Sequence, residues 1–246
     1  MFIQELTTNW NWAGARGFSP WPWLIVSLIF AVLAFSVRAA NRSGAIAGFA
    51  LCFFLCASGG FPVFAALIAV FVMAWLTTKI GYQRKVRLGT AEKTGGRNAL
   101  QVLANLGVAS FCAILYAVSG KEIFLLAIAA ALSEAAADTV SSEVGQLSSE
   151  KVRLVTTWRA VPVGTDGGVT VLGTLSGLAA AIVVSMVCAY GGIVAWNRIW
   201  IPILAAFCGT IADSFLGALL ERRKILNNDF VNFLGTLVAA LIAVIA

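Results

Sequence analysis

The sequence contains no histidine, and only 11% of its 246 residues are charged. Histidine is a frequent zinc ligand and the side chain most often used as a general base near neutral pH, so sites that depend on it are excluded. The five cysteines all stand within apolar segments, where we expect them to pack as small residues rather than to form disulfides or bind metal. Any bound metal ion would therefore have oxygen ligands.

Hydrophobic residues make up 60% of the chain, a share too high for a soluble domain of this length. Apolar runs of membrane-spanning length recur along most of the sequence, and the alternating segments of a β-barrel are absent. The sequence therefore predicts an all-α, polytopic transmembrane helical bundle, formed by a single integral membrane domain, residues 1–246. Eight spans are expected, at about 21–37, 44–58, 61–78, 99–118, 122–138, 168–190, 199–219 and 229–246.

The second of these spans is short and flanked by glycine, so we expect it to pack as a tight hairpin with the third. Residues 1–20 contain tryptophans, which are typical of a membrane interface, and lack the basic start of a signal peptide. We interpret them as an extracytoplasmic N-terminal segment.

Positive charges set the expected orientation of the bundle. Four loops that fall on one side of an eight-span bundle hold 14 of the 17 Lys and Arg residues: 38–43, 79–98, 139–167 and 220–228. Such loops face the cytoplasm, so both termini are expected outside. The formal net charge of +6 is explained by this topology, and no nucleic-acid partner is expected.

A run of acidic and polar residues ends the fifth span. Glu134 and Asp138 are four residues apart and share one face of a helix, and Ser142 and Glu143 follow shortly after. Carboxylates at membrane depth are costly and usually face a bundle interior or a watery cavity, so we interpret the run as functional. The alternative, a polar helix end among lipid headgroups, explains Glu143 well and Glu134 poorly.

Asp138 has a counterpart in Asp213. Each lies near the end of a span, and the span that follows each one contains Leu-Gly-Thr-Leu, at 172–175 and at 234–237. Both hairpins run in the same direction, as in a parallel helix-hairpin repeat, and chance similarity in Gly/Ala-rich sequence is the alternative of equal weight. Such a repeat would place the two aspartates at equivalent positions.

Lys93, Arg97, Asn98 and Asn105 surround the start of the fourth span, next to two glycines. Glycine permits close backbone approach, a helix N-terminus favours anions, and Lys and Arg bind phosphate oxygens, so this segment predicts a phosphorylated ligand. Contact with anionic lipid headgroups is the alternative. We favour that alternative for the remaining cations of the loop, Arg84, Lys85 and Arg87.

A glycine-rich turn, Gly164-Thr165-Asp166-Gly167-Gly168, enters the sixth span and is neither a Walker A loop nor GxGxxG. Beside the acidic residues it would complete an oxygen-lined site. Clustered Asp, Glu and Asn suit Mg²⁺, which usually takes one or two carboxylates together with substrate phosphates. Phosphates, Mg²⁺ and basic residues together indicate phosphoryl transfer.

Four segments in this order resemble one integral-membrane family, that of the plant phytyl-phosphate kinase of vitamin E (tocopherol) biosynthesis. They are Gly95–Asn105, Ala136–Gly145, Val161–Val169 and Ala212–Ala218, and the resemblance covers about residues 40–246. The plastid targeting extension of the plant enzymes is missing. We therefore expect a bacterial-type member in a prokaryotic inner (cytoplasmic) membrane, with its active site facing the cytoplasm.

The resemblance implies a kinase that converts an isoprenyl monophosphate, of the phytyl or geranylgeranyl type, to the diphosphate, with CTP or another nucleoside triphosphate as donor. We expect Mg²⁺ as the cofactor, bound by Asp138, Glu143 and Asp213 with Glu134 behind them. The expected catalytic residues are Asp138, Arg97, Lys93 and Asp213. Substrate or nucleotide binding is assigned to Asn98, Asn105, Ser142, Gly164, Thr165, Asp166, Gly167, Asn228, Asp229 and Asn232.

Two other activities fit the same residues. A secondary transporter of a small or anionic solute would use repeats and intramembrane acids, although here the polar groups gather at one face rather than near the midplane. A cytidylyltransferase acting on a lipid phosphate would also use CTP, but it would release pyrophosphate rather than CDP.

Overall fold

The computed structural model describes residues 21–92 and 95–246, so the predicted N-terminal segment 1–20 lies outside the described residues. Its helices are α2 (Trp21–Ser36), α3 (Arg42–Lys79), α4 (Tyr82–Leu88), α5 (Ala99–Ser119), α6 (Ile123–Gly145), α7 (Val171–Tyr190), α8 (Trp200–Leu216) and α9 (Asn228–Ile245). A 3₁₀ turn (Trp196–Arg198) precedes α8, a π-helix (Gly217–Glu221) follows it, and the short strands β1 (Arg153–Leu154) and β2 (Gly168–Val169) pair antiparallel. The all-α prediction is confirmed.

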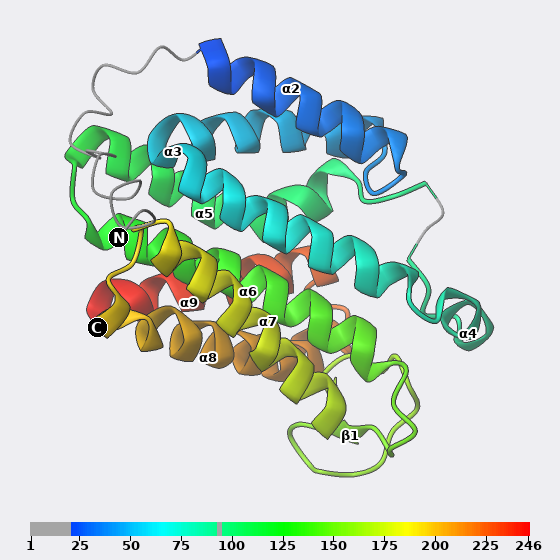
Figure 1. Cartoon of the computed structure of the whole chain (residues 1–246). Helices are drawn as coiled ribbons and strands as arrows, with labels where there is room; N and C mark the ends of the chain where they lie inside the picture. The colour runs from blue at the N-terminus through cyan, green and yellow to red at the C-terminus, as the bar shows by residue number, and fades with distance from the viewer. Residues whose placement is uncertain (1–20, 93–94) are drawn as a thin grey trace.

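Six helices, α3 and α5 to α9, are long and apolar enough to cross a membrane, and α2 is a shorter apolar helix. Helix α3 folds back at Gly60, whose backbone is not helical. Figure 1 shows its two arms side by side and running in opposite directions, and residues of both arms, such as Gly48 and Ala74, line one cavity. With these arms counted separately, the described residues contain eight apolar helical segments, as predicted.

The backbone and the length of α3 explain why it folds back. At φ 65° and ψ −157°, Gly60 occupies a region that is essentially restricted to glycine. Pro62 then lies in the first turn of the second arm, where its missing N–H leaves no helical hydrogen bond unmade. A continuous helix of 38 residues would be about 57 Å long, roughly twice the thickness of a bilayer core. The predicted tight hairpin is therefore confirmed.

Helix α6 lies at the centre of the bundle, in contact with α3, α5, α7, α8 and α9. Every residue from Leu125 to Ala137 is buried, and more than half of them are alanine. Small side chains let helix backbones approach closely, which is how helices associate where no water drives them together. On α7, for example, a Cβ at Gly177 would lie only 2.7 Å from the carbonyl oxygen of Ala137. The alanine-rich surface of α6 therefore organises the bundle around it.

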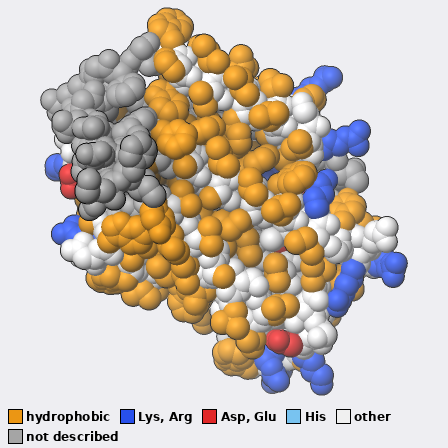
Figure 2. Space-filling view, viewed as in Figure 1, with side chains coloured by type: hydrophobic (Ala, Val, Ile, Leu, Met, Phe, Trp, Pro, Cys, Tyr) orange, Lys and Arg blue, Asp and Glu red, His pale blue; other side chains and the backbone are white. Residues whose placement is uncertain are grey.

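Figure 1 places four connections at one end of the bundle: the α2–α3 turn, α4 with the segment that follows it, the α6–α7 loop and the α8–α9 turn. Figure 2 shows Lys and Arg gathered mainly at this end, next to a broad hydrophobic surface over the helices. We call it the basic end. Its loops are those that the sequence predicted to be cytoplasmic, and the cytoplasmic assignment itself stays a prediction.

The α6–α7 and α8–α9 hairpins both run toward the basic end and back, in agreement with the direction of the predicted repeat (Figure 1). The second helices of the two hairpins start differently. Thr170 is the N-cap of α7, whereas Asn227 is the N-cap of α9. In the alignment of the two Leu-Gly-Thr-Leu segments, α9 therefore starts more than one turn earlier than α7, so the hairpins agree in direction but not in helix start.

Replacing Gly60 with alanine is expected to destabilise the protein by about 1–3 kcal/mol. The backbone at this position has φ and ψ angles that are essentially restricted to glycine, so a residue with a Cβ would be strained there. The measurement is the thermal unfolding midpoint of purified protein in detergent. Gly107→Ala in α5 is the matched control, since a Cβ there meets no atom within 4 Å. An unchanged midpoint in Gly60→Ala would contradict the account of the hairpin.

Candidate functional site

A cavity of about 360 Å³ lies at the basic end, between α6, α7, α8 and α9 and beneath the α6–α7 loop. Four carboxylates line it, those of Asp138, Asp166, Asp213 and Glu221. Within the described ranges, 21–92 and 95–246, no lysine or arginine lines it. We call it the acidic cavity.

The acidic cavity brings together most of the predicted site residues. Those that line it are Asp138, Ser142, Gly164, Thr165, Asp166, Gly167, Asp213, Asn228 and Asn232. They come from the acidic end of α6, the glycine-rich turn, the end of α8 and the start of α9. These motifs, which are far apart in the sequence, therefore form one site.

Glu221 is a lining residue that the sequence analysis missed. It ends the π-helix and interacts electrostatically with Asp166, Asp138 and Asp229. Two arginines follow it directly, so in the sequence it reads as part of a basic loop. A π-helix frequently marks a functional site, but hydropathy and spacing do not reveal one. Asp229 lies in the first turn of α9 and is not among the lining residues.

Glu134 lies behind the cavity, one turn before Asp138 on α6, and is 1% exposed. It interacts electrostatically with Asp138 and Asp213, so the three carboxylates form one cluster across α6 and α8. Two glycines make room for it: a Cβ at Gly209 would lie 2.6 Å from Glu134 Cγ, and one at Gly235 would lie 2.6 Å from Oε1. Helices α8 and α9 can therefore close around this carboxylate only because these positions carry no side chain.

Two oxygens of this cluster are buried without a hydrogen-bond partner in the described structure, Glu134 Oε1 and Asp213 Oδ2. A buried carboxylate oxygen without a partner is unfavourable, and a bound cation would satisfy it. As the side chains stand, no three Asp, Glu or Cys side chains among the described residues form a complete metal-ligand group. Asp138 and Asp213 could supply one or two carboxylates to a divalent cation such as Mg²⁺, with further oxygens from a substrate.

The glycine-rich turn is pressed against the end of α8. Gly167 has φ 73°, and a Cβ there would lie 2.5 Å from the backbone nitrogen of Ala218 and 2.6 Å from the carbonyl oxygen of Ser214. At Gly164, with φ 83°, a Cβ would meet the side chain of Thr90 at 2.3 Å. Both glycines are therefore needed where they stand, and they hold Thr165 and Asp166 over the acidic cavity.

A second cavity, of about 260 Å³, lies on the other side of α6. Its walls come from α2, both arms of α3, α5 and the segment that precedes α5. Charged residues Arg38, Lys79, Arg97 and Glu92 line it together with many apolar side chains, so we call it the amphipathic cavity. Helix α6 separates the two cavities, with Ala135 and Thr139 in this one and Asp138 in the acidic one.

The predicted phosphate-binding segment contributes to the amphipathic cavity rather than to the acidic one. Arg97 and Asn105 line this cavity and not the acidic one. Asn98 lines neither, because its side chain starts α5: Asn98 Oδ1 accepts from the Gln101 backbone N–H, and Gln101 Oε1 accepts from the Asn98 N–H. Lys93 lies outside the described residues. An electrostatic attraction between Arg97 and Asp138 links the described part of this segment to the acids.

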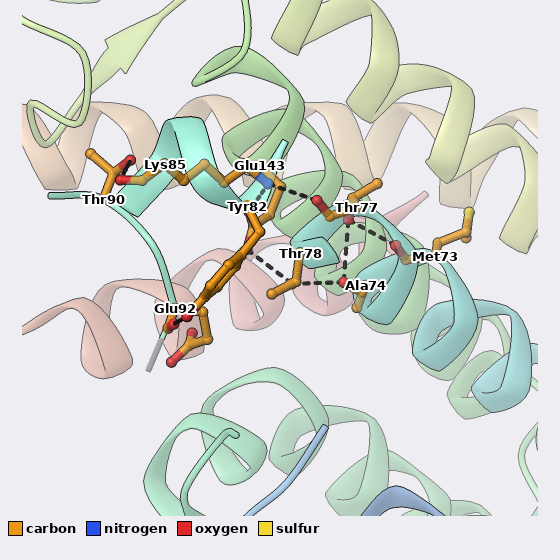
Figure 3. A network of polar contacts seen from close by, with 9 residues as sticks. All are labelled: Met73, Ala74, Thr77, Thr78, Tyr82, Lys85, Thr90, Glu92 and Glu143. Atoms are coloured by element: carbon orange, nitrogen blue, oxygen red, sulfur yellow. Dashed lines mark hydrogen bonds and ion pairs between the residues drawn. The ribbon is translucent and has the colours of Figure 1, made fainter. Parts of the chain in front are cut away.

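Glu143 does not join the acidic cluster, although the sequence placed it among the metal ligands. Figure 3 shows it bound to Lys85 of α4, with Lys85 Nζ 2.5 Å from Glu143 Oε2. Thr78 Oγ1 donates to Glu143 Oε1 at 3.0 Å, and Lys85 Nζ also donates to the carbonyl oxygen of Thr77 at 2.7 Å. Lys85 is fully buried, so its expected contact with lipid headgroups is wrong. The pair ties α4 to α3 and α6.

The family described as Integral membrane protein DUF92 matches residues 25–240 of this chain. An uncharacterized membrane protein of Methanocaldococcus jannaschii is 34% identical over 224 residues, or 89% of this chain and 91% of that protein. Protein PGR of Arabidopsis thaliana is 32% identical over 272 aligned positions, which cover 91% of this chain and 94% of that protein. The chloroplast protein VTE6 of the same plant is 30% identical over 252 aligned positions, which cover 99% of this chain and 73% of that protein. No solved structure matches.

Replacing Lys85 with methionine is expected to destabilise the fold by about 3–5 kcal/mol, because it leaves Glu143 buried and unpaired. The double variant Lys85→Met/Glu143→Gln should lose less than the sum of the two single variants, since both remove the same interaction. Unfolding midpoints of the four proteins measure this coupling. Arg87→Met, at an exposed position of the same helix, is the control, and additive losses would show that the pair is not coupled.

Proposed function

We propose that this chain, which belongs to the DUF92 family of integral membrane proteins, is a kinase that transfers the terminal phosphoryl group of a nucleoside triphosphate to an isoprenyl monophosphate. The family resemblance that the motifs indicated is confirmed by this membership. The activity itself, with CTP as donor, Mg²⁺ as cofactor and a site that faces the cytoplasm, is our proposal.

The acidic cavity is the observation that supports the proposal best. Four carboxylates line it, and no Lys or Arg among the described residues does. A triphosphate alone would therefore meet strong electrostatic repulsion there. Two buried carboxylate oxygens of the same cluster lack any partner in the described structure. A nucleotide accompanied by a divalent cation resolves both problems, because the cation neutralises the phosphates and occupies the unpaired oxygens.

Asp138 and Asp213 would hold the cation, with Glu134 completing the negative charge behind them. When bound, Mg²⁺ would neutralise the charge of the triphosphate and polarise its terminal phosphoryl group. The turn at Gly164–Gly168 would lie along the nucleotide, because its glycines allow the ligand to approach the backbone. Asn228 and Asn232 add amide groups from α9 on the same cavity.

The transfer step requires little proton chemistry from the protein. An oxygen of the acceptor monophosphate attacks the γ-phosphorus, and the bond from that phosphorus to the β–γ bridging oxygen breaks. The electron pair of that bond leaves with the nucleoside diphosphate. Because the attacking monophosphate is already an anion, no general base is needed, which agrees with a sequence without histidine. The chain then acts by positioning the reactants and balancing their charge.

Asp138→Asn and Asp213→Asn are each expected to lower kinase turnover at least about 100-fold, because each removes a charge that holds the cation. Purified protein would be incubated with CTP, Mg²⁺ and geranylgeranyl monophosphate, and lipid diphosphate and CDP would be followed by mass spectrometry. Glu122→Gln, at the other end of α6, is the matched control and should retain activity. Pyrophosphate in place of CDP would indicate cytidylyl transfer. No nucleotide consumption, with ion-coupled uptake into vesicles, would indicate a transporter.

Removal of divalent cations is expected to weaken nucleotide binding at least about tenfold, because the four carboxylates then repel the triphosphate. Equilibrium binding of labelled CTP would be measured with Mg²⁺ and with a chelator. In Asp138→Asn/Asp213→Asn the dependence on Mg²⁺ should shrink, since two of the repelling charges are absent. Binding that is equally tight without Mg²⁺ would exclude the acidic cavity as the nucleotide site.

A further inference from the structure

We infer that the amphipathic cavity binds an amphiphile with a phosphate monoester head and an apolar chain, with the head at Arg38 and Arg97. For the proposed function, this amphiphile is the isoprenyl monophosphate that accepts the phosphoryl group. The identity of the acceptor rests on that function, whereas the binding site rests on the cavity alone.

The lining of the cavity changes from charged to apolar along its length. Arg38 lies in the α2–α3 turn, Lys79 ends α3 and Arg97 precedes α5, whereas Phe30 and Leu67 lie within α2 and α3. Phe30 lies in α2, eight residues before Arg38, and Leu67 lies twelve residues before Lys79 along α3. At 1.5 Å per helical residue, Leu67 lies about 18 Å from the charged end. Such a gradient suits a ligand with an anionic head and a hydrocarbon chain.

The arginines are held in place through their backbones while their side chains stay available. The Arg97 N–H donates to the carbonyl oxygen of Ala39 at 3.0 Å, and the Arg97 carbonyl oxygen accepts from Asn41 at 3.0 Å. At Gly96, with φ 82°, a Cβ would lie 2.7 Å from the Arg38 carbonyl oxygen, so only glycine lets the two segments meet. Among residues 21–92 and 95–246, neither guanidinium donates a hydrogen bond to a protein atom.

The indole N–H of Trp75 is a further donor in this cavity. It is buried, and the described structure provides it with no hydrogen-bond partner. It lies one turn before Lys79 on α3, near the charged end. The single carboxylate of the lining, Glu92, accepts from Gln101 Nε2 at 3.3 and 3.4 Å, and the cavity keeps an excess of positive charge. These unsatisfied donors and this charge favour an anionic head.

The apolar part has room for a chain. Phe30 and Phe71 meet edge to face at its wall, with ring centroids 4.9 Å apart, and Leu106 of α5 lines it as well. At Gly48 of α3, a Cβ would have only one neighbour within 4 Å, a methyl group of Val102 at 4.0 Å. A volume of about 260 Å³ is close to the lower end of small-molecule sites. The cavity would therefore hold the head and the first isoprene units.

The position of this cavity suits a role in transfer. Helix α6 forms its wall through Ala135 and Thr139, and Asp138, one residue before Thr139, lines the acidic cavity. Arg97 is close enough to Asp138 for electrostatic attraction. A monophosphate bound by Arg97 would consequently lie across α6 from the acidic cavity, within electrostatic range of Asp138.

Gly48→Leu tests the site, because Gly48 lines the cavity and a Cβ there meets only a methyl group of Val102, so the larger side chain would occupy cavity space. We expect the affinity for a fluorescent geranylgeranyl monophosphate to fall at least about tenfold, and the affinity for CTP with Mg²⁺ to stay unchanged. Gly107→Leu, in α5 and outside both cavities, is the matched control and should bind like the parent protein. Equal binding in Gly48→Leu would overturn the proposal.

Competitors identify the head and the chain. Unlabelled geranylgeranyl monophosphate should displace the probe, whereas geranylgeraniol should not, since it lacks the phosphate. Displacement by phosphatidate as effective as by the isoprenyl monophosphate would overturn the proposal and indicate a site for membrane-lipid headgroups.

A photoreactive isoprenyl monophosphate keeps the test valid if Gly48→Leu does not fold, because it needs only the parent protein. Peptides of α2, α3 or α5 should carry the label, and labelling confined to α7, α8 or α9 would overturn the proposal. Both binding readouts are independent of turnover. Probe binding in this cavity without formation of lipid diphosphate would contradict the kinase proposal and support the binding site. Kinase turnover that is unchanged in Gly48→Leu would contradict the binding site and support the kinase proposal.

Discussion

The close packing of helices around α6 is the constraint on which the rest of the structure depends. Where no water drives helices together, they associate through short backbone approaches, and α6 provides these with a surface that is largely alanine. Gly177 of α7 completes one such approach at Ala137. Because other helices enclose α6, its polar residues face neighbouring helices or the gaps between them. Asp138 faces the acidic cavity and Thr139 faces the amphipathic one.

The two cavities differ in charge, and in the proposed kinase each would hold a different reactant. Acids line one of them, with two carboxylate oxygens buried and unpaired in the described structure. Arginines and an unpaired indole N–H line the other, which continues into an apolar interior. In the proposed kinase, opposite charges in neighbouring sites would hold two anionic reactants, because a divalent cation would neutralise one and arginine the other. That arrangement meets the main demand of phosphoryl transfer, which is positioning and charge balance.

Glycines and a buried ion pair hold the polar segments of the basic end in place. Gly96 and Gly167 have positive φ and stand where a Cβ would meet backbone atoms, so they permit contacts that no other residue would allow. The Lys85–Glu143 pair anchors α4, which leads into the segment that carries Arg97. In this structure the pair joins α4 to α3 and α6 and lines neither cavity.

The sequence by itself determined the helical membrane class, the eight apolar segments and the hairpin at Gly60. It also indicated Asp138 and Asp213 as candidate site residues. These features could be predicted because hydropathy, helical periodicity and glycine placement are local properties of the sequence. Only the tertiary structure decided that Arg97 and Asp138 line different cavities, that Glu143 pairs with Lys85, and that Glu221 joins the acids. Asn98, a predicted phosphate ligand, proved to be a helix cap. The partner of a buried charge is chosen by the packing of helices that are distant in the chain, as for Lys85 and Glu143, which are 58 residues apart. A local sequence pattern therefore could not predict this partner.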